Sequence, residues 1–163
     1  MNTNALLIEQ AKPVVGLSNT TPTASTPDYV SLKNFEKLTI IILALNATTV
    51  TGSAITVKQA TDVSAGNEKA LAFSKMYANT DVGADDALVE TAVTNNTFTT
   101  ATTNSKSLMY VIEINANDLD VDGGFDCVRA GTGNATAATL TVLYLLWPPK
   151  YGKGKALPSA IID

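Results

Sequence analysis

An acidic stretch with regular spacing is the first candidate for chemistry in this chain of 163 residues. Asp118, Asp120 and Asp122 alternate with apolar residues and precede Gly123, which matches the first half of an EF-hand calcium loop. The second half departs from that motif, because the twelfth position is Arg129 where a bidentate Glu is required. We therefore expect a polar turn, with no metal and no other cofactor. A looser calcium site on the three aspartates is the alternative.

The residue types of this chain give little support for an enzyme. The chain has no histidine, which excludes Ser/His/Asp and Cys/His nucleophile systems and histidine metal ligands. Asp85, Asp86 and Glu90 are the nearest approach to a carboxylate pair for glycoside hydrolysis, but they fall in or beside a polar loop where charge is normally solvated. We expect that the protein is not an enzyme.

Charge and hydropathy limit the classes of partner that the protein is expected to bind. The net charge is −4, and the basic side chains cluster only as Lys150, Lys153 and Lys155, so we expect no nucleic-acid binding. No run approaches the length of a membrane span, and the first residues lack the features of a signal peptide, so we expect a soluble protein made in a cytoplasm, with no membrane partner. Cys127 is the single cysteine, and we expect it to be buried and inert.

The elements that must position these residues are strands. Threonine is abundant, with 23 residues, and β-branched residues favour pleated strands. Alternation of apolar and polar residues predicts about eight strands, separated by turn signals at short intervals. The predicted strands cover residues 29–32, 37–45, 54–59, 67–80, 108–114, 125–130 and 139–146, with a hairpin of 88–93 and 97–100 around Asn95-Asn96. This pattern predicts an all-β, single-domain β-sandwich or jelly-roll-like barrel.

Two of the predicted strands raise questions about exposure. The run from Lys37 to Leu45 is almost continuously apolar, as expected for a central strand covered on both faces. Leu143 and Leu145 lie opposite the inner face of the last strand, where they either form an exposed apolar stripe or face the second layer of the sandwich. We expect the second arrangement. Trp147-Pro148-Pro149 is expected to end that strand.

Extended terminal arms are expected on either side of the sandwich domain. Residues 1–27 are predicted to form an N-terminal arm, 28–149 the sandwich, and 150–163 a C-terminal tail. Both arms combine polar, proline- or glycine-containing stretches with a few apolar residues, which suits either clasping a neighbouring subunit or docking on the chain's own domain. The candidate interaction residues of the arms are Leu6, Leu7, Ile8, Val14, Val15, Leu157, Ile161 and Ile162.

Four segments resemble a family of small structural proteins of tailed bacteriophages. They are residues 28–35 leading into the strand at 37–45, residues 56–61 with 69–73, residues 119–129, and the ending Pro158-Ser159-Ala160-Ile161-Ile162-Asp163. The resemblance covers most of the chain from Asp28 onward and consists of packing and turn patterns without a catalytic signature.

The resemblance implies a virion component, most specifically a decoration or cement protein on the capsid surface, assembled in the bacterial host cytoplasm. Its implied partners are the major capsid protein and further copies of itself, with a trimer favoured. A neck or tail component is the second interpretation. A soluble carbohydrate-binding β-sandwich module is the third, with Trp147 as the candidate aromatic platform.

Overall fold

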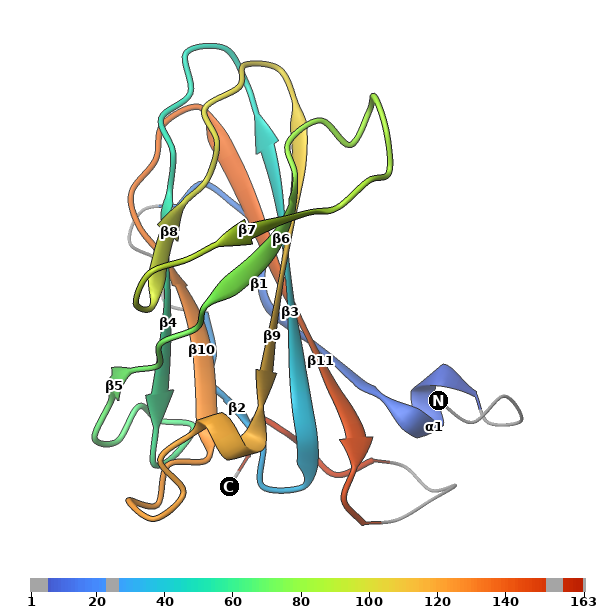
Figure 1. Ribbon diagram of the computed structural model, residues 1–163, viewed down its shortest axis with the longest axis vertical. Coiled ribbons are helices and arrows are strands. Elements are labelled where there is room, and N and C mark those ends of the chain that lie inside the picture. Colours follow the sequence, from blue (N-terminus) through green and yellow to red (C-terminus); the bar gives the residue numbers. More distant parts are fainter. Residues whose placement is uncertain (1–5, 23–26, 152–156, 163) are drawn as a thin grey trace.

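Two antiparallel sheets packed face to face make up the protein (Figure 1). The computed structural model describes residues 6–22, 27–151 and 157–162. The larger sheet contains, in spatial order, β1 (Lys12–Thr20), β11 (Ala138–Pro149), β3 (Phe35–Asn46), β9 (Ser107–Asn115), β6 (Lys75–Asn79) and β7 (Val89–Ala92). The smaller sheet contains β2 (Val30–Ser31), β10 (Cys127–Thr132), β4 (Ala54–Ala60) and β5 (Lys69–Ala70), with β8 (Thr97–Thr99) also paired to β4. A short helix, α1 (Leu7–Gln10), precedes β1, and a 3-10 turn, η1 (Ala116–Asp118), follows β9.

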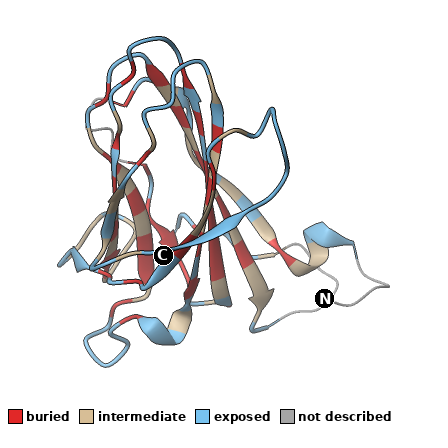
Figure 2. Ribbon diagram, turned by 45° about the horizontal axis from the view of Figure 1, so that its top comes forward, coloured by how far each residue is buried: buried red, intermediate tan, exposed pale blue. Residues whose placement is uncertain are grey.

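The core lies between the two sheets, because alternate side chains of each strand point inward. Leu38, Ile40 and Ile42 of β3 have no exposed surface, and Figure 2 shows buried residues recurring along the strands of both sheets. Tyr144 of β11 spans the gap, and its hydroxyl accepts a hydrogen bond of 3.1 Å from the backbone N–H of Ala130 in β10. The prediction of an all-β sandwich is therefore confirmed, and the two sheets do not close into a barrel.

The predicted strand at 67–80 and the predicted hairpin of 88–100 are both wrong in detail. The first divides into β5 of the small sheet and β6 of the large sheet, and the second into β7 of the large sheet and β8 of the small one. The chain crosses between the sheets twice here, and the crossing segments bond to each other: Phe73 N–H donates to Asn95 O at 2.9 Å, and Val93 N–H to Ser74 O at 2.9 Å. Alternation along the sequence marks strands but does not say which sheet receives them.

Parts of the two predicted arms dock on the domain itself. Residues 12–20 form β1, an edge strand of the large sheet, and Val14 packs against the core. Near the other terminus, Ala160 is buried and its carbonyl accepts a hydrogen bond of 2.7 Å from Ser31 N–H of β2, while Leu157 packs against the core. Residues 1–5, 23–26, 152–156 and 163 of these arms lie outside the described residues. The last strand continues through its prolines and ends at Pro149.

Candidate interaction surface

The face of the large sheet that points away from the small sheet, here called the outer face, is rich in apolar side chains. Directly paired residues of antiparallel strands share a face. The register therefore sets Val15, Leu143, Ile41, Val111 and Tyr77 side by side in one row across β1, β11, β3, β9 and β6. Further apolar members of the outer face flank this row, and they are Pro13, Leu145, Leu43, Met109 and Leu45.

Solvent reaches much of the outer face. Val15 and Leu45 are each 57% exposed and Leu43 is 43% exposed, while Leu143 and Leu145 are half-buried. An antiparallel sheet with one solvated face normally alternates apolar inward and polar outward, so this apolar outer face departs from the usual pattern and is a candidate interaction surface.

The outer face corrects two expectations. The strand at 37–45 is not covered on both faces, and Leu143 and Leu145 do not face the second layer. The reason is that β3 and β11 are apolar on both faces, whereas the chain supplies only one covering sheet. The second apolar face of β3 and β11 therefore faces solvent. In the sequence, the outer face of this strand corresponds to apolar residues at alternate positions, namely Ile41, Leu43 and Leu45. They were interpreted as part of a strand covered on both faces.

Polar contacts border one end of the outer face. The Trp147 indole N–H donates to the Thr39 hydroxyl at 2.8 Å, and Lys37 Nζ lies 5.3 Å from the centroid of the Trp147 ring. A lysine over the ring occupies the position in which a sugar would stack. Trp147 is thus a weak candidate for the aromatic platform that a carbohydrate-binding module requires.

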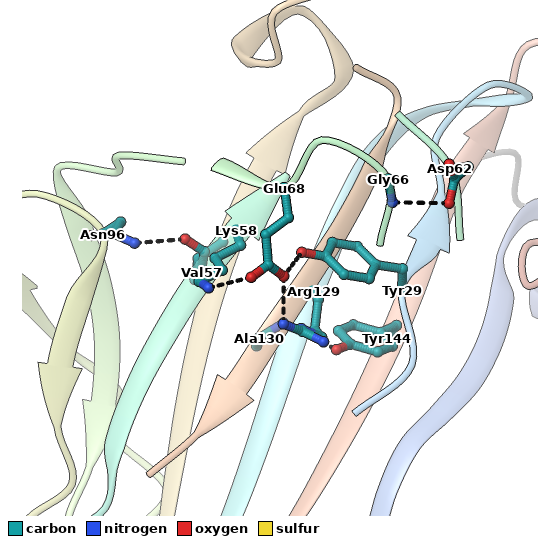
Figure 3. Close-up of polar contacts among 10 residues, drawn as sticks. All are labelled: Tyr29, Val57, Lys58, Asp62, Gly66, Glu68, Asn96, Arg129, Ala130 and Tyr144. Carbon is teal, nitrogen blue, oxygen red and sulfur yellow. Dashed lines mark hydrogen bonds and ion pairs between the residues drawn. The ribbon is translucent and has the colours of Figure 1, made fainter. Parts of the chain in front are cut away.

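On the small sheet, the face that points away from the large sheet carries a network of polar side chains. Figure 3 shows Glu68 at its centre: Oε2 accepts hydrogen bonds from the Tyr29 hydroxyl at 2.7 Å and from Arg129 at 2.6 Å, and Oε1 accepts one from Lys58 at 2.5 Å. The Arg129 guanidinium also lies 4.6 Å from the centroid of the Tyr29 ring. Arg129 and Lys58 are directly paired on β10 and β4, so Glu68 ties two strands to the turn that carries it.

Electrostatics in this network favour the charged form of Glu68. Hydrogen bonds from Lys58 and Tyr29 lower the pKa of the Glu68 carboxyl below its ordinary value of 4.5, with further lowering by the positive charge of Arg129. Burial and the hydrogen bond to Glu68 raise the pKa of the Tyr29 hydroxyl. The network links β4 and β10 to Tyr29 and to the turn that carries Glu68. Sequence reasoning missed it, because its members are far apart along the chain.

The three aspartates of the calcium hypothesis have separate environments. Asp118 accepts hydrogen bonds from the backbone and side chain of Asn115 at 2.8 and 3.1 Å, whereas Asp120 forms an ion pair with Lys69, which lowers the pKa of Asp120. Asp122 lies in an exposed turn. Over residues 6–22, 27–151 and 157–162, no three potential ligands among His, Cys, Asp and Glu gather where they could hold a metal ion.

Two of the other acidic candidates, Asp85 and Glu90, also have structural partners. Asp85 accepts hydrogen bonds from Asn79 Nδ2 at 3.2 Å and from Ala87 N–H at 2.9 Å, which fixes the loop between β6 and β7. Glu90 accepts bonds from Lys75 at 3.1 Å and from the Tyr77 hydroxyl at 3.0 Å on the exposed surface. These carboxylates support a loop and a strand pair, and they do not line a cleft together.

The arm residues divide between buried and exposed positions. Leu6, Leu7 and Ile8 at α1 are 69%, 56% and 58% exposed, and Ile161 and Ile162 are 46% and 70% exposed. No helix within the described part of the chain is long and apolar enough to span a membrane. Large apolar side chains are therefore exposed at α1, at the C-terminal end and on the outer face, and also at Val82, Leu88, Val89 and Val121.

Comparisons with known proteins identify no family for this chain. No protein-family model matches the chain, and no curated protein sequence matches it. Among solved structures, the crystal structure of the SPBc2 prophage-derived protein YomS is similar, with a TM-score of 0.46 and 17% identity, covering 83% of this chain and 91% of that one. A likeness at this level says nothing about binding partners.

Proposed function

We propose that the protein is a structural component of a tailed-bacteriophage virion, and that it serves as a decoration protein bound to the major capsid protein through its outer face. The observation that carries the proposal is the row of apolar side chains across five strands, centred on Ile41 and Leu143. A surface of this kind buries apolar area on a partner.

The sequence resemblance supplies the phage context of the proposal. Its segments fall on β2, β3, β4, β5, β10 and the C-terminal end, and the segment at β3 carries Ile41, Leu43 and Leu45 of the outer face. The polar side chains described above brace strands and loops, which suits a protein whose task is binding. A small, rigid sandwich with one apolar face meets the physical requirements of a cement protein.

Copy number in purified particles tests the proposal. Quantitative mass spectrometry of particles from the source of this chain should find hundreds of copies per particle, in a fixed ratio to the major capsid protein. About six to a dozen copies would contradict decoration and favour a neck or tail component, because cyclic symmetry at those positions limits the number of subunits. Absence from the particles would overturn the virion assignment.

A further inference from the structure

Strand β9 becomes an edge of the large sheet over its last residues. Its pairing with β3 continues to Asn115, whereas its pairing with β6 ends at Val111, which pairs with Tyr77. Figure 1 shows β6 diverging from β9 at this point, toward β5 of the small sheet. Glu113, two residues past Val111, therefore has a partner on β3 and no residue of β6 in register. An exposed strand edge of this kind can pair with a further strand.

The backbone N–H and C=O of Glu113 point to the open side of β9. The Asn115 N–H donates to the Asp118 carboxylate at 2.8 Å, so it points away from β3. Backbone groups two residues apart on a strand point to the same side, which places those of Glu113 on this side as well. Val111, two residues earlier again, uses the same side to pair with Tyr77. One donor and one acceptor are thus presented where the next strand of the sheet would lie.

A groove with a volume of about 780 Å³ lies along this edge. It is bounded by the end of β9 with η1 and by the two segments that cross between the sheets, at residues 72–75 and 93–95. Its apolar lining includes Ile114, Phe73 and Val93, which belong to the core or pack against it. No residue of the apolar row on the outer face is among its described lining residues. The groove is therefore a surface distinct from that row.

The charge left without a partner in the groove is negative. Its described lining residues include three charged side chains, namely Lys75, Glu113 and Asp118. Lys75 pairs with Glu90 at 3.1 Å, and Asp118 accepts hydrogen bonds from Asn115. Glu113 is exposed and forms no ion pair within residues 6–22, 27–151 and 157–162. A basic side chain is therefore the complementary group for this edge.

We propose that the groove binds a short extended segment of a partner protein, which adds to the edge of β9 as a strand and places a lysine or arginine beside Glu113. Strand addition takes its affinity from main-chain hydrogen bonds and its specificity from alternate side chains. The residue directly opposite Glu113 shares its face, and the neighbours of that residue point the other way, toward Ile114 and Phe73. The segment recognised is thus a basic residue between two apolar ones. This binding site and attachment through the outer face can each exist without the other.

Titration of the full chain with synthetic peptides tests the proposal. The first probe is acetyl-Thr-Val-Lys-Val-Thr-amide, and in the second a glutamate replaces the lysine. In heteronuclear NMR spectra the first peptide should shift the amide signals of Glu113 and Asn95 at the groove and leave that of Val15 on the outer face unchanged. The second peptide should bind about tenfold more weakly, because it sets two carboxylates side by side. The lysine peptide methylated on the lysine backbone nitrogen should not bind, because it lacks the main-chain donor for the Glu113 carbonyl.

Charge reversal at Glu113 makes the test specific. Glu113→Lys should reverse the preference and bind the glutamate peptide about tenfold more tightly than the lysine peptide. Asp86→Lys makes a similar change in the exposed loop between β6 and β7, outside the groove, and should keep the original preference. Both residues are exposed, so both variants should fold normally by circular dichroism.

Four results would each overturn the proposal. They are the absence of shifts at the groove with millimolar peptide, equal binding of the two peptides by the unmodified chain, undiminished binding of the methylated peptide, and an unchanged preference in Glu113→Lys.

Discussion

Replacing Glu68 by alanine should destabilise the fold far more than removing any single surface charge. The substitution deletes the acceptor shared by the Tyr29 hydroxyl and the Arg129 guanidinium, at 2.7 and 2.6 Å. Tyr29 is 2% exposed and the Arg129 side chain 13% exposed, so water replaces the lost acceptor poorly. The third partner, Lys58, is 36% exposed and can turn to solvent.

The magnitude follows from the two groups that lose their partner. A buried donor left without an acceptor costs about 1–3 kcal/mol, which places the total near 3 kcal/mol for Glu68→Ala. Lys58→Ala removes only the exposed side of the network and should cost less than about 1 kcal/mol. For a domain of this size, about 2–4 °C of melting temperature corresponds to each kcal/mol, so Glu68→Ala should melt roughly 9 °C lower.

Urea unfolding, followed by Trp147 fluorescence, measures both variants against the unmodified chain. The midpoint should fall sharply for Glu68→Ala and barely for Lys58→Ala, with similar slopes if both variants unfold in one step. A loss below about 1 kcal/mol for Glu68→Ala, or equal losses for the two variants, would refute the assignment of Glu68 as the centre of the network.

Three further predictions concern packing, pH and metal. Gly16→Ala should destabilise the domain by about 1–3 kcal/mol in urea unfolding, because the added Cβ would lie 2.3 Å from Cε2 of the buried Tyr144 ring; an unchanged midpoint would contradict this packing. The pKa of Glu68 is lower in the folded state, so its stabilisation is present above the ordinary value of 4.5 and is lost as pH falls through the folded-state pKa. Stability measured against pH should therefore decline less steeply on acidification for Glu68→Gln, and parallel curves would contradict the lowered pKa. Excess calcium or EDTA should leave the melting temperature unchanged, and a rise with calcium would restore the site on the three aspartates.

The strands that alternate along the sequence could be predicted, and their assignment to sheets could not. The segments at 37–45, 54–59, 108–114 and 139–146 correspond to β3, β4, β9 and β11, because apolar side chains at every second position have few other ways to be buried. The segments at 67–80 and 88–100 cross between sheets, and their partners depend on contacts distant in the sequence. A periodic pattern contains no information on such contacts.

Only some residues of the candidate interaction surface could be predicted from the sequence. Leu143 and Leu145 stood out as an apolar set opposite the inner face, but whether a second layer covers them depends on the number of sheets that the whole chain builds. The role of Glu68 could not be predicted from the sequence, because its three partners lie up to 61 residues away along the chain. Among the arm residues, Leu6, Leu7 and Ile8 are exposed at α1, whereas Val14 is part of the sheet edge and packs inward.

Binding of outer-face variants to heads that lack this protein tests whether the outer face attaches the protein to the capsid. Leu43→Lys alters an outer-face residue that is 43% exposed, and Val121→Lys makes the same kind of change at an exposed residue elsewhere. Both should fold normally, because substitutions at exposed positions usually change stability by less than about 0.5 kcal/mol. In cosedimentation with the heads, the unmodified chain and Val121→Lys should bind equally and Leu43→Lys should stay in the supernatant. Equal binding of all three proteins would contradict the account, because the apolar outer face would then play no part in attachment.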